Sequence, residues 1–90
     1  MFKELEYLIK TIRERKTSSN NDSYTSKLLN DKNLSVAKVK EEIEELIEAI
    51  DNNSNKIHES ADVFYHLLVY LESSNVKIED VMLELRKRQK

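Results

Sequence analysis

The most restrictive feature of this 90-residue sequence is that it contains neither glycine nor proline. Phosphate-binding loops and dinucleotide-binding turns need glycine, because a side chain would block the close approach of the backbone to a phosphate. Two-residue β-hairpins also depend on glycine-containing turns such as Asn-Gly. The sequence therefore predicts an all-α fold, and it excludes the common glycine-rich nucleotide-binding loops.

Length and composition narrow the class of protein further. Residues 1–90 are short enough for a single domain, and the 39% of hydrophobic residues gives a core so small that oligomerisation is expected. No cysteine is present, which excludes disulfides and Cys-ligated zinc. The net charge of -2 gives no basic surplus, so we expect no nucleic-acid partner. No apolar run reaches the roughly 18–20 residues of a membrane span, and the first residues do not resemble a signal peptide, so we expect a cytoplasmic protein without a membrane partner.

The spacing of apolar residues predicts four long helices and one short helical turn. The polar stretch 17–23 separates the first long helix from the turn, and a second polar break follows residue 50. Ser35 is the expected N-cap of the second long helix, and Asn75 is expected to end the third in a left-handed conformation. The predicted ranges are 2–16, 24–29, 36–50, 56–73 and 78–88.

Three of the long helices carry apolar residues that are expected to be buried. The third long helix is apolar nearly all round, so its stripe of Phe64, Leu67, Leu68 and Leu71 is expected in the core or in a dimer interface. In the last helix, Val81, Leu85 and Met82 are expected to face inward. The predicted core stripe of the second long helix consists of Val36, Val39, Ile43, Leu46, Ile47 and Ile50.

Two pairs of acidic residues carry the chemistry that the sequence suggests. Glu42 and Glu45 form an E-x-x-E motif, and Glu59 and Asp62 form an E-x-x-D motif in the apolar third helix. A short connection makes these helices antiparallel neighbours, so the pairs can face each other. Carboxylates in an apolar setting need a partner, and oxygen ligands suit Mg²⁺ or Mn²⁺. The alternative is a solvated acidic surface. His66, one turn after Asp62, is expected to hydrogen-bond beside the ligands rather than to act as a ligand or general base.

Three segments resemble the phosphoribosyl-ATP pyrophosphohydrolases of histidine biosynthesis, within the all-α MazG-type nucleoside triphosphate pyrophosphohydrolase superfamily. The first, at 23–28, reads S-Y-T-S-K-L and is similar to the family's S-Y-T-x-K-L segment. The second, at 38–45, reads K-V-K-E-E-I-E-E and resembles K-V-G-E-E-A-x-E. The third, at 59–69, reads E-S-A-D-V-F-Y-H-L-L-V and resembles E-x-A-D-L-x-Y-H-L-L-V. The likeness extends over nearly the whole chain.

The resemblance implies a MazG-like bundle of four to five helices, completed by formation of a homodimer. It also implies Mg²⁺-dependent hydrolysis of phosphoribosyl-ATP to phosphoribosyl-AMP and pyrophosphate. The resemblance assigns Glu42, Glu45, Glu59 and Asp62 to the metal, with Glu41, Glu42 and Glu45 as the catalytic group. Glu41 is the candidate outer ligand or proton acceptor, and the candidate substrate contacts are Ser23, Thr25, Lys27 and Lys38.

Two other functions stay open at this point. Lys40 stands where the family usually has glycine, which is a mild reason to consider a related pyrophosphohydrolase that cleaves ordinary or modified (d)NTPs, although the S-Y-T segment favours the phosphoribosyl-ATP enzyme. A helical interaction module with an acidic face, and without catalytic activity, is the alternative from a different functional class.

Overall fold

The computed structural model describes residues 1–17 and 23–89, and these residues form five helices and no strand. The all-α prediction is therefore confirmed. Thr17, predicted to open the polar break, is the last residue of the first helix, and the rest of that break up to residue 22 lies outside the described residues. The helices are α1 (Lys3–Thr17), α2 (Tyr24–Asn30), α3 (Lys32–Asp51), α4 (Lys56–Ser73) and α5 (Ile78–Lys87).

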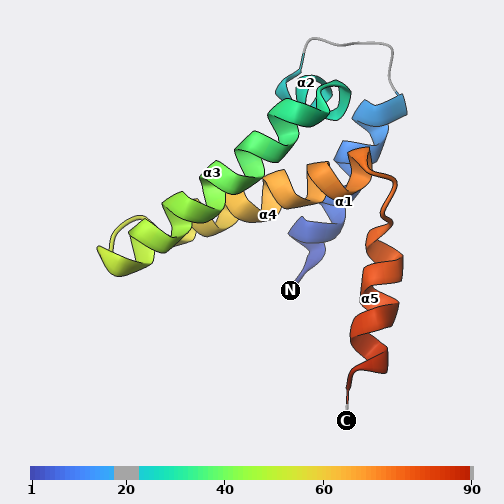
Figure 1. Ribbon diagram of the computed structural model, residues 1–90. Helices are drawn as coiled ribbons and strands as arrows, with labels where there is room; N and C mark the ends of the chain where they lie inside the picture. The colour runs from blue at the N-terminus through green and yellow to red at the C-terminus, as the bar shows by residue number, and fades with distance from the viewer. Residues whose placement is uncertain (18–22, 90) are drawn as a thin grey trace.

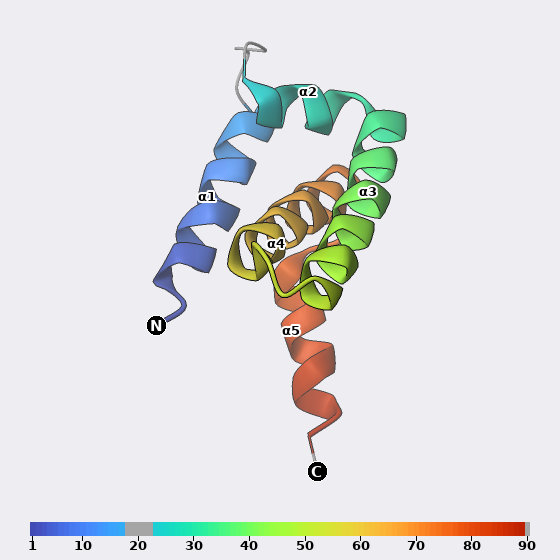
Figure 2. The ribbon, with the colours of Figure 1, turned by 90° about the vertical axis from the view of Figure 1, so that its left-hand side faces the viewer.

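Helix α4 lies at the centre of the arrangement. Helix α3 packs along it as an antiparallel neighbour, as the short connection predicted, and α2 and α1 also contact it. Seen from the side, α1, α2 and α3 form three sides of a frame around α4 (Figure 2). Helix α5 follows α4 and points away from the other helices in both views (Figures 1 and 2). The α3–α4 pair therefore positions the predicted acidic motifs, and α2 closes one end of it.

Asparagine takes the backbone conformations that glycine usually supplies. Asn53, Asn55 and Asn75 have φ values of 51°, 55° and 61°, in the left-handed region that asparagine tolerates better than most residues. The first two lie in the turn between α3 and α4, and the third follows α4 as predicted. Helix α4 itself begins and ends at the predicted residues. The chain thus makes tight helix connections without glycine.

The prediction that Ser35 caps α3 is wrong. The helix begins at Lys32, and Asp31 is its N-cap, accepting a hydrogen bond of 3.1 Å from the backbone N–H of Leu34. A carboxylate at this position also interacts favourably with the positive end of the helix dipole. Ser35 lies within the first turns of α3 and is buried.

The buried core is small, and the predicted stripe of α3 is not in it. Ile12, Leu28 and Val69 form the buried cluster between α1, α2 and α4. On α3, the side that is buried carries Ser35, Glu42 and Ala49, each seven residues from the next. That side of α3 lies against α4 and divides the predicted stripe. Val36, Val39 and Leu46 are half-buried, whereas Ile43, Ile47 and Ile50 are exposed.

Other predicted core residues are also exposed in the single chain. Phe64 and Leu67 on α4 are 57% and 39% exposed, and Met82 and Leu85 on α5 are each 49% exposed. Met82 and Leu85 are therefore not part of a core in the single chain, contrary to expectation, because α5 points away from the other helices, whereas Val81 is half-buried. In the part of the chain that the structure describes, no helix has both the length and the apolar character needed to cross a membrane.

Candidate metal and active site

Three of the predicted carboxylates meet across the α3–α4 pair. Glu42 and Glu45 project from α3, and Glu59 projects from the first turn of α4. One carboxylate oxygen from each of the three lies within 4.8 Å of the others. The E-x-x-E spacing puts the two α3 residues one turn apart on one side of the helix, and the antiparallel packing brings Glu59 opposite them.

The cluster is partly withdrawn from solvent and lacks enough donors. Glu42 is only 5% exposed. Its Oε1 lies 3.5 Å from the Lys38 ammonium, but its Oε2 has no hydrogen-bond partner among the described residues, and neither has Oε2 of Glu59. An unpaired buried oxygen on a carboxylate is costly, so these two atoms point to a missing positively charged ligand.

The raised pKa values of two of these carboxyl groups also indicate that a cation is missing from the cluster. Desolvation raises the pKa of Glu45, and the negative charge of Glu42 beside it raises this pKa further. Desolvation likewise raises the pKa of Glu59, with a further contribution from the charge of Glu45. The structure thus holds three acidic groups close together at a cost that a cation would remove.

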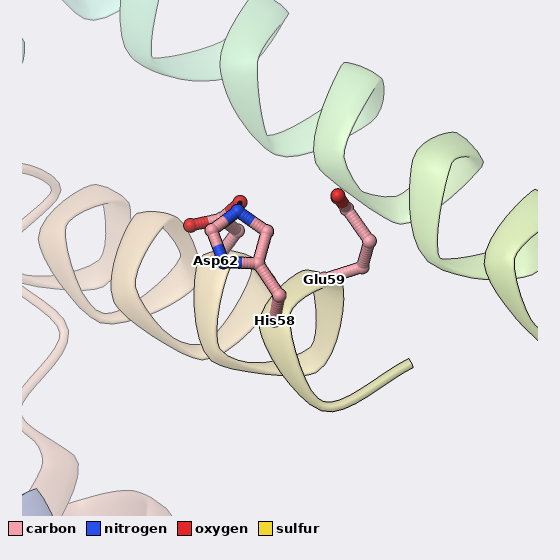
Figure 3. Close-up of side chains that lie close together, drawn as sticks. All are labelled: His58, Glu59 and Asp62. Atoms are coloured by element: carbon pink, nitrogen blue, oxygen red, sulfur yellow. Dashed lines mark ion pairs between the residues drawn. The ribbon is translucent and has the colours of Figure 1, made fainter. Parts of the chain in front are cut away.

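Asp62 belongs to a second group that shares Glu59. The ligand atoms of His58, Glu59 and Asp62 also lie within 4.8 Å of one another. His58 Nε2 is 3.4 Å from Asp62 Oδ2, and Figure 3 shows the two side chains together, with Glu59 directed towards α3. The four predicted ligands therefore form two overlapping groups rather than one. Sequence reasoning missed His58, although its i, i+4 spacing to Asp62 was a signal that could have found it.

Lys38 and Glu41 lie beside the acidic cluster on α3. The Lys38 ammonium donates a hydrogen bond of 3.0 Å to Glu41 Oε2, and this bond raises the pKa of the lysine. Glu41 itself is exposed, on the solvent side of Glu42. Lys27 is exposed on α2. A lysine ammonium group supplies a compact positive charge and three hydrogen-bond donors, which is what a phosphate-binding role requires.

The other two predicted substrate contacts use their hydroxyl groups within the chain. Ser23 is the N-cap of α2, where its Oγ accepts a hydrogen bond of 3.0 Å from the backbone N–H of Ser26. Thr25 Oγ1 is hydrogen-bonded to the Tyr65 hydroxyl on α4. Both residues therefore help to fix α2, and their contact with substrate stays a prediction.

His66 is buried and hydrogen-bonded on both ring nitrogens. Its Nδ1 lies 2.8 Å from the backbone carbonyl oxygen of Asp62, and its Nε2 lies 2.9 Å from the Tyr24 hydroxyl. The residue is 6% exposed and belongs to neither group of close ligand residues. This geometry matches the hydrogen-bonding histidine that the sequence led us to expect.

The donor set fits a hard divalent cation. Glu42, Glu45, Glu59 and Asp62 supply carboxylate oxygens, which suit Mg²⁺ and Mn²⁺, and the unpaired oxygens of Glu42 and Glu59 could be satisfied by such an ion. A cation with few protein ligands, with the Lys38 ammonium beside it, is able to bind and polarise a phosphate group. The arrangement is thus suited to metal-assisted hydrolysis of a phosphoanhydride.

Comparison with known proteins gives one consistent result. The family model described as "Phosphoribosyl-ATP pyrophosphohydrolase" matches residues 5–89. A protein named phosphoribosyl-ATP pyrophosphatase from Bacillus mycoides is 42% identical over 93% of this chain and 81% of its own length. Another of the same name, from Haloarcula marismortui, is 39% identical over 93% of this chain and 91% of its own length. A chloroplastic bifunctional histidine biosynthesis protein from Arabidopsis thaliana is 39% identical, and the match covers 32% of it.

Proposed function

The chain belongs to the phosphoribosyl-ATP pyrophosphohydrolase family, a family of hydrolases, and from this premise we propose that it hydrolyses phosphoribosyl-ATP to phosphoribosyl-AMP and pyrophosphate. The reaction depends on Mg²⁺, with Mn²⁺ as a possible substitute, and takes place in the cytoplasm as the second step of histidine biosynthesis. The match of the family model to residues 5–89 includes both acidic motifs, Lys27 and Lys38.

The observation that carries the proposed metal dependence is the pair of unpaired oxygens on Glu42 and Glu59. Each is a buried acceptor without a donor among the residues described, within a cluster of like charges. A protein whose acidic face was only a solvated surface would leave these oxygens in contact with water. The cluster is instead held between α3 and α4, which favours a site that is completed by a cation.

The residues take distinct roles in this proposal. Glu42, Glu45, Glu59 and Asp62 hold the metal, which when bound offsets the charge of the triphosphate and makes water a better nucleophile. Glu41 is the proposed proton acceptor at the exposed edge of the cluster, and the hydrogen bond from Lys38 supports this role by orienting its carboxylate. Lys38 and Lys27 contribute positive charge for the phosphate groups.

Pyrophosphate release from phosphoribosyl-ATP tests this function directly. The wild-type chain is assayed with Mg²⁺ and with EDTA, and ATP and the dNTPs are assayed in parallel. Glu59→Gln, which removes the carboxylate shared by both ligand groups, is expected to lower turnover at least 100-fold, whereas Glu44→Gln at an exposed position on α3 is expected to keep it.

Each outcome of this assay has a definite meaning. Mg²⁺-dependent release from phosphoribosyl-ATP alone supports the proposal. Release from ATP or dNTPs instead keeps the metal site but assigns the chain to the related (d)NTP pyrophosphohydrolases. If no substrate releases pyrophosphate, the catalytic proposal is wrong and an interaction module becomes the better explanation.

We also propose that the enzyme is a homodimer. The radius of gyration of 14.2 Å exceeds the value of about 12 Å expected for a compact 90-residue domain. An apolar groove between α1 and α5, lined by Phe2, Leu5, Ile9 and Met82 among others, is open in the single chain. Ile43, Ile47 and Ile50 add exposed apolar side chains on α3, so a second copy of the chain is the expected partner of these surfaces.

A further inference from the structure

Two neighbouring side chains on α2 are each hydrogen-bonded to one of two neighbouring side chains on α4. Tyr24 is bonded to His66, and Thr25 is bonded to Tyr65. The ring of Tyr24 also stacks on Tyr65, with 6.2 Å between the ring centroids and 19° between their planes. These contacts fix the first turn of α2 against the helix that carries Glu59 and Asp62.

The backbone of α4 determines which nitrogen of His66 carries the proton. The carbonyl oxygen of Asp62 can only accept, so Nδ1 of His66, at 2.8 Å, must be the donor. In the neutral ring Nε2 is then an acceptor, and the Tyr24 hydroxyl, at 2.9 Å, must donate to it. The chain of hydrogen bonds therefore runs in one direction, from Tyr24 through His66 to the peptide of Asp62.

Tyr24 also lies close to the charged end of the site on α3. The Lys38 ammonium and the Glu42 carboxylate both act electrostatically on its hydroxyl group, although desolvation is the larger influence and raises its pKa. Three residues further along α2 is Lys27, the other lysine with a proposed role in phosphate binding. The tyrosine thus sits where a small shift of α2 changes the distance between the lysine of α2 and the carboxylates of α3 and α4.

We propose that His66 is a positioning residue: through its hydrogen bond with Tyr24 it sets the place of α2, and thereby of Lys27, relative to the acidic cluster that receives the substrate. This inference rests on the proposed function and extends it to residues that touch neither metal nor substrate. A loss of the bond weakens substrate binding more than it slows the chemical step, because the carboxylates of α3 and α4 stay in place.

Two substitutions of His66 separate its two hydrogen bonds. Gln places a polar group near Nε2 and keeps an acceptor for Tyr24, whereas Asn places its amide near Nδ1 and keeps only the donor to the Asp62 carbonyl. Tyr24→Phe removes the same bond from the other side and keeps the stacked ring. Tyr7→Phe on the exposed face of α1 is the matched control for loss of a tyrosine hydroxyl.

Steady-state KM and kcat are measured for each variant on phosphoribosyl-ATP, ATP and dNTPs, at a temperature well below the Tm of every variant. Tyr24→Phe and His66→Asn are expected to raise KM about 3- to 10-fold with kcat changed less than 3-fold, the range that corresponds to one neutral hydrogen bond. The double variant is expected to be no worse than the poorer single one, because both changes remove the same bond. His66→Gln and Tyr7→Phe are expected to keep KM within about 2-fold of wild type.

Three results would overturn the positioning role: an unchanged KM in Tyr24→Phe, additive losses in the double variant, or a His66→Gln enzyme as poor as His66→Asn. If the wild type hydrolyses phosphoribosyl-ATP and any of these three results is obtained, the positioning role is refuted and the proposed function is not. A wild type active only on dNTPs refutes the proposed substrate, and the same KM pattern on a dNTP still supports the role of His66. A chain without turnover on any substrate refutes both.

Discussion

Replacement of Glu42 by glutamine tests the candidate metal site, because it removes one negative charge and keeps the size of the side chain. Glu42 is 5% exposed, and one of its oxygens is an unpaired buried acceptor in the described structure. Such an atom costs about 1–3 kcal/mol, and the glutamine amide is able to donate to a neighbouring carboxylate. Loss of the contact with Lys38, 3.5 Å away, offsets part of the gain. We expect the metal-free variant to be about 1 kcal/mol more stable than wild type, which raises Tm by roughly 4–8 °C.

Addition of Mg²⁺ is expected to reverse this order. A ligand at 100 times its Kd stabilises the native state by about 2.7 kcal/mol, which corresponds to roughly 10–20 °C for a domain of this size. The wild type is expected to gain this stabilisation. Glu42→Gln is expected to lose most of it, because one of the carboxylates that bind the ion is missing. Thermal unfolding is followed by circular dichroism in EDTA and across a Mg²⁺ titration, with Glu44→Gln as a control that keeps the wild-type response.

The two halves of the prediction fail in different ways. A metal-free Glu42→Gln chain less stable than wild type shows that the carboxylate is satisfied without a cation. A variant that keeps the full Mg²⁺-dependent shift shows that Glu42 is not a ligand. Either result refutes the reasoning from the unpaired oxygen.

Three further predictions follow from other parts of the structure. Arg13 donates two hydrogen bonds to Glu79 and lowers the pKa of that carboxyl from 4.5 to about 2, so the pair stabilises the fold above pH 4.5 and this contribution is lost as the pH falls towards 2. Glu79→Gln is therefore expected to lower Tm slightly at pH 7, with the difference from wild type closing between pH 4.5 and 2; a constant difference would contradict this. Leu28→Ala, at a fully buried position, is expected to cost about 2–5 kcal/mol in urea unfolding, and a loss below 1 kcal/mol would show that the core is elsewhere. Ile47→Glu, at a site 55% exposed, is expected to convert the proposed dimer to monomer in sedimentation velocity without unfolding the chain, and an unchanged mass would remove the exposed isoleucines of α3 from the proposed interface.

The helices could be predicted from the sequence because the residues that indicate a helix and its ends lie within the segment itself. Apolar spacing and polar breaks gave α4 its correct first and last residues, and Asn75 was recognised as a left-handed cap. The start of α3 was missed because two residues, Asp31 and Ser35, both suit an N-cap, and only the fold shows which one accepts the bond from Leu34. The E-x-x-E and E-x-x-D spacings likewise identified residues that the structure places together.

The face that each helix buries could not be predicted from the sequence, because it depends on which other helix packs against it. A wheel places Ile43 and Ile47 on the most apolar side of α3, yet the tertiary structure turns that side outward and buries Glu42 against α4. The division of the acids into two groups with His58, and the bond from Tyr24 to His66, also depend on contacts between helices. Local periodicity is a property of the chain alone, so the sequence determined the helices and the chemical character of the site. Which side chains are buried, and which residues they contact, depends on which helix faces meet. Only the packing of α2, α3 and α4 decided that.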